Sequence, residues 1–402
     1  MHILISTDQN VSSLGGVQVS IRLQQRYLRA AGHRVSVVAP RSFTGAEPDA
    51  DDILLPAVPI TGDREYAASW PGASAVRRLD RELAGRPPVD LVHVQGDYWG
   101  AVLGYRFAAR HGIPAVLTAH NNLDSGIRQV LPFPGVAIRG LLLAQRALLR
   151  PRRSRVRASA AAILNEYALR SAAVTAPSGH FARLLERTGA ASGVQVVWNG
   201  VDDAVIDEIL SGAPRPGARA ESRRPVFLWT GRMSQEKRFL EFLDAVAAAD
   251  LDAEYRVYGQ GLLLSQGRER VAAMERAGSR STVRFLGKVG YRESLQRIRD
   301  ADALVQTSIG FETQGMTVFE AAALGTASIV SDPNIAAELP DGACTRPADG
   351  SVSALADALA EAEARIRSGR WLRVPAMASE RVLQSRQTER MLEVYRSALA
   401  AD

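Results

Sequence analysis

The sequence has almost none of the cysteine that disulfide frameworks and many metal sites need. Its 402 residues include a single cysteine, Cys344, which excludes a disulfide within this chain, a cysteine-based zinc site and an iron–sulfur cluster. The six histidines contain no His-Glu-x-x-His arrangement, so we expect no zinc site either. One cysteine in a chain of this length is typical of a reducing compartment.

Long apolar runs are also missing. No stretch of about 18 apolar residues occurs, so no segment is expected to span a bilayer. Residues 1–8 lack the basic region of a secretory signal and instead predict a buried strand. We expect a cytoplasmic location, either free or peripheral on the inner face of the membrane.

The composition is that of a folded protein with a modest positive charge. Hydrophobic residues make up 46% and charged residues 23%, which argues against disorder. The length predicts two domains, each with its own core. The net charge of +6 suggests an anionic partner, but the sequence shows no aromatic interleaving that would support nucleic-acid binding.

Short β-branched runs alternate with longer helical patterns along the whole chain. This alternation predicts βαβ units and parallel, doubly wound sheets. Strands are expected at residues 2–7, 34–39, 91–95, 115–119, 173–177, 194–198, 226–230, 254–259, 283–286, 303–306 and 327–330. The predicted domains are 1–205 and 226–375, joined by a linker at 206–225 that is rich in Pro, Gly and Arg, with a helical tail at 376–402.

Two loops that follow predicted strands carry the clearest chemistry. In the first, Arg232 and Lys237 can neutralise a diphosphate. In the second, Gly315 opens a helix whose first free N–H groups favour an anion, and Glu312 and Glu320 can hold neighbouring hydroxyls of a sugar or ribose. The alternative interpretation is an ordinary basic loop and a surface helix with glutamates.

These motifs together resemble the family 4 retaining glycosyltransferases. The resemblance covers almost the whole chain and rests on seven segments in the family's order: Gly15-Gly16-Val17, Thr118-Ala119-His120, Asn199-Gly200-Val201-Asp202, the Gly-Arg-x4-Lys loop at 231–237, Gly259-Gln260-Gly261, Phe285-Leu286-Gly287-Lys288-Val289 and the Glu-x7-Glu pair. It implies an α/β protein of the GT-B class, with two Rossmann-like doubly wound domains facing a central cleft.

The resemblance also implies a role for each matched residue. In such enzymes the second domain binds the nucleotide-sugar donor and the first binds the acceptor. The donor-binding positions implied here are Gly15, Gly16, Arg232, Lys237, Lys288, Val289, Glu312, Gly315, Met316, Thr317 and Glu320. Those implied to act at the reaction centre are His120, Arg232, Lys237 and Glu312.

Within that set the family assigns separate tasks. Arg232 and Lys237 match the residues that bind the donor diphosphate, Glu320 matches the one that holds the ribose, and Glu312 lies near the transferred sugar. Lys288 and Val289 belong to the segment that contacts the base. The loop with Gly15 and Gly16 closes over the phosphate or sugar.

The implied reaction is hexose transfer with retention, without a metal or other cofactor. The donor is expected to be UDP-glucose, UDP-galactose or GDP-mannose, and the leaving phosphate oxygen takes the acceptor proton. Other activities remain open: transfer to a soluble sugar, sugar phosphate or polysaccharide, nucleotide-sugar binding without catalysis, or an epimerase or phosphorylase on the same architecture. Two Asp-x-Asp segments, at 49–51 and 300–302, are not expected to bind a catalytic metal.

A basic segment at 128–157 has its own implication. Eight arginines and no acidic residue lie between Ser125 and Asn165. Ile138, Leu141, Leu142, Leu148 and Leu149 form an apolar stripe beside arginines at 139, 146 and 150. Such a segment can lie on anionic lipid, or it can pack on its own domain with a solvated basic face. The segment 312–317 also looks like that of lipid glycosyltransferases acting on diacylglycerol, which favours a lipid acceptor.

Overall fold

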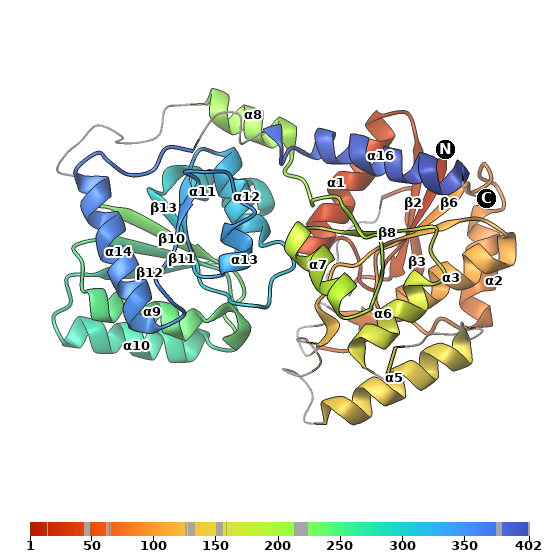
Figure 1. Ribbon diagram of the computed structural model, residues 1–402, viewed down its shortest axis with the longest axis horizontal. Coiled ribbons are helices and arrows are strands. Elements are labelled where there is room, and N and C mark those ends of the chain that lie inside the picture. The colour runs from red at the N-terminus through yellow and green to blue at the C-terminus, as the bar shows by residue number, and fades with distance from the viewer. Residues whose placement is uncertain are drawn as a thin grey trace. The chain divides into compact units, whose positions relative to one another are not determined.

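The chain folds into two units, each built around a parallel sheet (Figure 1). The computed structural model describes residues 1–13, 15–43, 49–61, 64, 66–124, 127, 133–149, 156–157, 159–212, 224–374 and 380–400. The first unit contains Met1–Gly200 and Gln384–Asp402, and the second contains Val201–Leu383. No helix within the described ranges is both long and apolar enough to cross a membrane.

The first unit contains a seven-stranded parallel sheet with the order β3-β2-β1-β6-β7-β8-β9. The strands are β1 (His2–Ser6), β2 (Arg34–Pro40), β3 (Ile53–Leu55), β6 (Leu91–Val94), β7 (Ala115–Thr118), β8 (Ala173–Ala176) and β9 (Gln195–Val196). Two short strands, β4 (Val58–Pro59) and β5 (Ala67–Ala68), form a separate antiparallel pair. The helices are α1 (Gly16–Ala30), α2 (Ala73–Leu83), α3 (Trp99–His111), α5 (Pro134–Leu148), α6 (Ala160–Ala168), α7 (Gly179–Arg187) and α16 (Gln384–Ala400).

Both faces of this sheet are covered by helices. Successive strand residues point to opposite faces, so Leu4 packs with α2 and α3, whereas Ile3 and Ile5 pack with α1 and α16. Because both faces are buried, the strands consist of almost continuous apolar residues instead of an alternating pattern.

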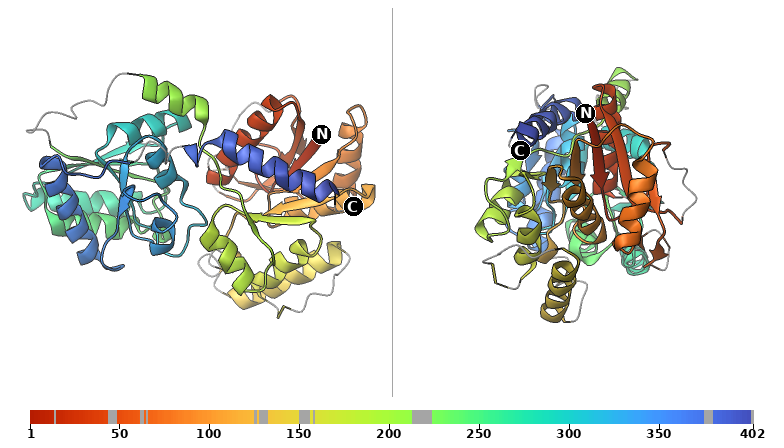
Figure 2. Two further views of the ribbon diagram at one scale, coloured as in Figure 1. Left: turned by 45° about the horizontal axis from the view of Figure 1, so that its top comes forward. Right: turned by 90° about the vertical axis from the view of Figure 1, so that its right-hand side faces the viewer.

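The C-terminal helix α16 belongs to the first unit (Figure 2). Its apolar residues, among them Met391 and Leu392, are buried in a cluster with residues of α1 and β7. The Tyr395 hydroxyl hydrogen bonds to Nδ1 of His93 at 2.7 Å. The helical tail predicted at 376–402 contains this helix, whose apolar face packs within the first unit.

The second unit contains a six-stranded parallel sheet with the order β12-β11-β10-β13-β14-β15. The strands are β10 (Val226–Thr230), β11 (Glu254–Tyr258), β12 (Thr282–Gly287), β13 (Ala303–Gln306), β14 (Ala327–Val330) and β15 (Cys344–Thr345). The helical segments are α8 (Asp203–Ser211), the 3₁₀ turn η1 (Gln235–Lys237), α9 (Phe239–Ala249), α10 (Leu264–Arg276), α11 (Tyr291–Asp300), α12 (Met316–Ala323), α13 (Pro333–Ala336) and α14 (Val352–Arg367).

Helix α8 also changes the predicted domain boundary. It occupies part of the expected linker at 206–225, and it packs on α11 within the second unit. Glu208 of α8 forms an ion pair with Arg292 of α11. The second unit therefore begins at Val201 and not at residue 226, while residues 213–223 lie outside the described ranges.

In the second unit, the loop between β10 and α9 and the loop between β11 and α10 contact each other closely at glycine residues. The Met233 N–H donates to the Gln260 carbonyl at 3.0 Å, so the β11–α10 loop lies directly on the β10–α9 loop. A Cβ at Gly259 would lie 1.9 Å from the Gly231 carbonyl oxygen, and one at Gly261 would lie 2.4 Å from the Met233 oxygen. The Gly259-Gln260-Gly261 motif is therefore required for this close approach.

We predict that Gly261→Ala destabilises the protein by about 1–3 kcal/mol, because the new methyl group must displace the backbone at Met233. Urea unfolding measures the free energy of unfolding. Gly85→Ala is the matched control, since a Cβ there meets no atom within 4 Å. Equal stability of the two variants would contradict this account of the crossing.

Candidate functional site

The strand order of the second sheet brings two loops together at one edge. Strand β10 lies between β11 and β13. The chain runs from β10 to β11 and β12 on one side, then crosses back over β10 to β13 on its other side. Parallel α/β sheets bind ligands at the carboxyl ends of the strands where the order reverses in this way. The loop after β10 carries Arg232 and Lys237, and the loop after β13 carries Glu312.

Lys237 and Glu312 meet across these two loops. The Lys237 ammonium forms an ion pair with the Glu312 carboxylate. The same carboxylate oxygen accepts a hydrogen bond from the Ser308 hydroxyl at 3.0 Å, and the ammonium lies 5.7 Å from the centre of the Phe311 ring. Both charged side chains are partly exposed. A phosphate or sugar hydroxyl can therefore approach them without unfolding the loops.

Hydrogen bonds beneath the pair fix the Lys237 backbone. The buried Trp229 indole donates to the Thr307 hydroxyl at 3.0 Å, and that hydroxyl donates to the Lys237 carbonyl at 2.6 Å. In the same loop Met233 is fully buried, whereas the adjacent Arg232 is exposed. The loop is thus anchored at its apolar residue and presents its cations outward.

Helix α12 begins at the end of the second loop. Gly315 precedes it with φ of 77°, a left-handed conformation that favours glycine. The first intrahelical bond runs from Val318 N–H to the Gly315 carbonyl. The N–H groups of Met316 and Thr317 therefore point from the helix N-terminus, where the helix dipole favours an anion.

Glu320 lies one turn into α12 and is 6% exposed. Within the described part of the chain, no hydrogen bond or ion pair reaches its carboxylate. Burial raises its pKa to about 7. A buried carboxylate without donors is costly alone, but it becomes favourable once hydroxyl groups of a ligand donate to it.

Lys288 and Val289 follow β12, at one end of the same sheet. The Gly259 N–H donates to the Gly287 carbonyl at 2.7 Å, so this segment is tied to the loop after β11. Lys288 is exposed and Val289 is half-buried.

The remaining predicted site residues belong to the first unit. Gly15 precedes α1 in an extended conformation, and Gly16 is the first helical residue. His120 follows β7 and is buried. Its Nε2 lies 2.8 Å from the Gln95 side-chain oxygen. Because an amide oxygen only accepts, Nε2 carries the proton, and burial lowers the His120 pKa to about 4. His120 is therefore a neutral polar group at pH 7.

Gln95 links His120 to a buried polar network. The Gln95 amide nitrogen donates to the Gln24 oxygen at 2.8 Å and to His93 Nδ1 at 3.1 Å. His93 is fully buried, and desolvation lowers its pKa to about 3. This network holds the loop after β6 against the loop after β7.

The sequence prediction missed Asp97, which follows β6 and is 2% exposed. One of its carboxylate oxygens accepts from the Asn121 amide, and the other is buried without a hydrogen-bond partner. Burial and the nearby Asp8 raise its pKa to about 7. Its position just after a central strand is the sequence signal that could have identified it. The Asp8 carboxylate accepts the backbone N–H groups of Asp97 and of Gly100 at the start of α3, and so fixes this loop.

Both Asp-x-Asp segments are engaged in internal contacts. Asp302 accepts the Val226 N–H at 2.8 Å at the amino end of β10, on the opposite edge of the sheet from Lys237. Asp49 forms an ion pair with Arg29 at 2.8 Å. These contacts explain the aspartates as structural groups.

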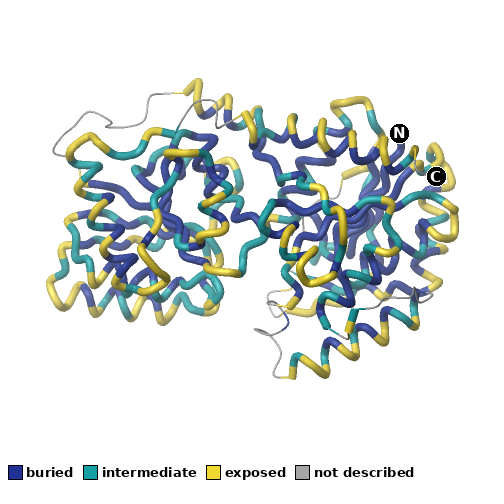
Figure 3. Tube along the Cα trace, viewed as in Figure 1, coloured by how far each residue is buried: buried dark blue, intermediate teal, exposed yellow. Residues whose placement is uncertain are grey.

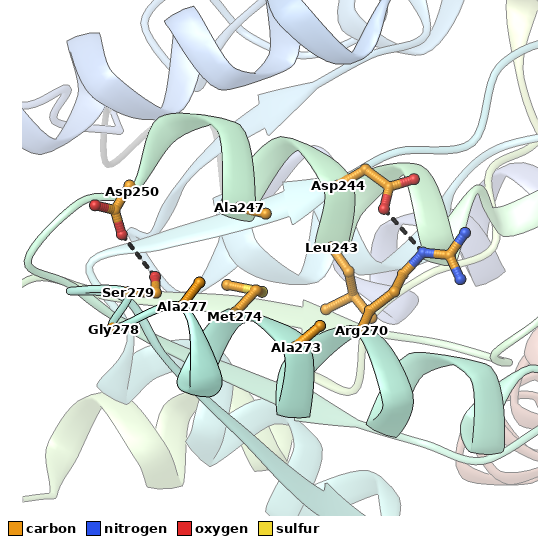
Figure 4. Close-up of a pocket in the computed structure, with 10 residues that line it drawn as sticks. All are labelled: Leu243, Asp244, Ala247, Asp250, Arg270, Ala273, Met274, Ala277, Gly278 and Ser279. Atoms are coloured by element: carbon orange, nitrogen blue, oxygen red, sulfur yellow. Dashed lines mark hydrogen bonds and ion pairs between the residues drawn. The ribbon is translucent and has the colours of Figure 1, made fainter.

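A hollow of about 510 Å³ lies between α9 and α10 (Figure 4). The charged groups that line it already have partners. Arg270 forms an ion pair with Asp244 at 2.8 Å, and Asp250 accepts a hydrogen bond from the Ser279 hydroxyl at 2.6 Å. Asp250 ends α9 and Ser279 follows α10, so the hollow extends toward the amino ends of the strands. It is separate from the residues that the sequence predicts to act.

Comparisons with known proteins agree with this arrangement. The family model for Glycosyltransferase Family 4 matches residues 14–205, and that for Glycosyl transferases group 1 matches residues 224–364. A phosphatidyl-myo-inositol mannosyltransferase of Mycolicibacterium smegmatis is 28% identical over 380 residues, which cover 92% of this chain and 86% of that protein. An alpha-monoglucosyldiacylglycerol synthase of Streptococcus pneumoniae is 24% identical over 349 residues, covering 81% and 70% respectively.

Solved structures show the same fold. Sucrose-phosphate synthase from Thermosynechococcus elongatus superposes with a TM-score of 0.71 at 18% identity, covering 100% of this chain and 99% of that one. Anabaena HepE in complex with UDP gives 0.68 at 17% identity, covering 99% and 100%. These structures confirm the predicted GT-B class. Since a Glycosyltransferase Family 4 domain and a Glycosyl transferases group 1 domain together span most of its length, the chain is a glycosyltransferase.

Proposed function

We propose that this glycosyltransferase is a retaining, metal-independent enzyme that moves a hexose from UDP-hexose or GDP-mannose to a membrane lipid. The observation that carries the donor part is the pairing of Lys237 with Glu312 beside α12, which bears the buried and unpaired Glu320. A nucleotide sugar consists of a diphosphate between a ribose and a hexose. The cations and the helix N-terminus suit the diphosphate, and the two carboxylates suit the hydroxyl groups of the ribose and the hexose.

Each group has a task in this proposal. Lys237 and the exposed Arg232 bind the diphosphate, together with the N–H groups of Met316 and Thr317. Glu320 accepts hydrogen bonds from the ribose hydroxyls, and Glu312 accepts them from the transferred sugar. Because the leaving diphosphate gains negative charge in the transition state, cations fixed in advance lower the barrier most.

The acceptor proton needs a base, and His120 is a poor one. With a pKa of about 4 it binds a proton only weakly at neutral pH. In the proposed mechanism the leaving phosphate oxygen takes the proton from the acceptor hydroxyl as the new glycosidic bond forms on the same face. His120 then serves as a neutral hydrogen-bonding group beside the sugar.

The lipid acceptor is supported by two of the similar proteins. The mannosyltransferase of M. smegmatis is named for a phosphatidyl-myo-inositol acceptor, and the synthase of S. pneumoniae is named for a glucosylated diacylglycerol product. Incubating the protein with radiolabelled UDP-glucose or GDP-mannose and with diacylglycerol or phosphatidylinositol in detergent micelles tests this part. Label that remains entirely in the aqueous phase with every pair would contradict it.

We predict that Lys237→Ala lowers kcat/KM for transfer by about 100-fold or more, because the diphosphate loses its fixed cation. Arg270→Ala is the control. It also removes the cation of an ion pair in the second unit, but Arg270 lies within α10 and pairs with Asp244 of α9 instead of Glu312. Both variants should melt close to the parent protein. Unchanged turnover in Lys237→Ala would remove its proposed role.

We predict a pH dependence that arises from Glu320. Its folded pKa of about 7 lies above that of an exposed glutamate, so its ionisation destabilises the fold as the pH rises toward 7. Without ligand, Glu320→Gln should therefore melt above the parent at pH 8, and this difference should shrink at pH 5. With UDP or GDP, the parent should gain more stability at pH 8 than at pH 6, because the ionised carboxylate accepts from ribose.

A thermal-shift series at pH 5, 6 and 8, without ligand and with UDP, GDP or ADP, measures these effects and identifies the preferred nucleotide base. Glu320→Gln supplies the control, because it retains the titration of the nucleotide but lacks that of the carboxylate. A nucleotide-induced shift with the same pH dependence in both proteins would count against the ribose contact.

We predict that an excess of EDTA leaves the transfer rate unchanged and that the product keeps the anomeric configuration of the donor. The aspartates of both Asp-x-Asp segments already bind internal partners, so the cation charge is assigned to Arg232 and Lys237 instead. Proton NMR of the product gives the configuration. Activity lost in EDTA and restored by Mn²⁺ would show that the metal-independent mechanism is wrong.

A further inference from the structure

The outward face of α5 is apolar. Phe133, Val136 and Leu143 expose 73%, 70% and 68% of their surface. The exposed positions 140, 144 and 147 between and after them are glycine or alanine. Figure 3 shows this exposed edge along α5, at the margin of the first unit. A surface helix of a folded protein ordinarily presents polar residues there, so this face is suited to a partner.

The opposite face of α5 is already occupied. Ile138 and Leu142 are buried in the core of the first unit, and the Gln145 amide donates to the Ile163 carbonyl of α6 at 3.0 Å. The apolar stripe predicted from the sequence therefore packs inward and does not meet lipid. Arg146, predicted to be part of a basic face, pairs with the buried Glu166 of α6. The exposed apolar residues form a second surface that the sequence pattern did not separate from the first.

The charge around this surface indicates its partner. Arg139 lies on α5 between Val136 and Leu143 and is exposed, and within the described ranges no carboxylate pairs with it. The sequence from 126 to 164 contains eight arginines and no acidic residue, of which Arg139, Arg146 and Arg157 belong to the described residues and the other five lie outside them. A second copy of the chain would bring the same positive charge against itself. Apolar side chains flanked by arginines instead match an anionic lipid surface.

We propose that the outward face of α5 is a membrane-docking surface, on which Phe133, Val136 and Leu143 enter the boundary between headgroups and acyl chains of an anionic bilayer. This inference rests on the proposed lipid acceptor. The docking surface and His120 both belong to the first unit, to which the proposed function assigns the acceptor. Docking through α5 holds the first unit at the bilayer that contains the acceptor.

Vesicle flotation tests the surface directly. The parent, Val136→Glu/Leu143→Glu and the control Leu210→Glu are compared on phosphatidylcholine vesicles with and without phosphatidylglycerol. Leu210 is an exposed leucine on α8 of the second unit, so it matches the change without touching α5. We expect the parent and control to bind the anionic vesicles, and the double variant to bind at least about tenfold less.

Controls separate misfolding and self-association from docking. Since Val136 and Leu143 are exposed, the double variant should melt like the parent and should show the same thermal shift with nucleotide. Parent-like flotation of the double variant would overturn the inference. So would a parent that ignores anionic vesicles and elutes as a dimer in size-exclusion chromatography, with the double variant eluting as a monomer.

The outcome is distinguishable from failure of the proposed function. If the double variant floats like the parent while the parent glycosylates lipid in micelles, the docking surface is wrong and the lipid acceptor stands. If flotation depends on α5 but no lipid is glycosylated in micelles, the surface stands and the acceptor is wrong.

Discussion

The adjacency of β10 and β13 is the constraint on which the candidate donor site depends. Their register places the ends of both strands at one edge, and the loops that follow carry Lys237 and Glu312. The bonds from Trp229 to Thr307 and from Thr307 to Lys237 fix the two loops to each other. The cation and the carboxylate are therefore held by the sheet itself, and their spacing is set before any ligand arrives.

The two glutamates of the Glu-x7-Glu pair show how one residue type acquires two roles. Glu312 is partly exposed and shares its charge with Lys237, so it can exchange that partner for a ligand hydroxyl. Glu320 is buried on α12 without a cation, and its pKa rises to about 7. In the proposed function, this cost in the free protein is recovered when hydroxyl groups of the donor reach the carboxylate.

Sequence patterns predicted the strands of both sheets accurately, but they did not predict how segments distant in the sequence pack together. Buried parallel strands have continuous apolar runs, so β10, β13 and β14 lie where they were predicted, and the strand–loop positions of Arg232, Lys237 and Glu312 follow from them. The return of α16 to the first unit depends on contacts with α1 and β7 hundreds of residues away, which periodicity does not encode. Likewise, α5 is apolar on two faces, and only its packing on α6 shows which one is covered.

Burial also limits which group of the first unit can handle a proton. Asp97, with a pKa of about 7, binds a proton more tightly than His120 does. However, one of its carboxylate oxygens is enclosed without a hydrogen-bond partner, and the other accepts from the Asn121 amide. His120 follows the neighbouring strand β7 and holds no charge near neutral pH. Both groups are buried, so among the described residues at this end of the first sheet neither is an exposed base of adequate strength. This supports the proposed mechanism, in which the departing phosphate takes the proton of the acceptor as the bond to the donor sugar breaks.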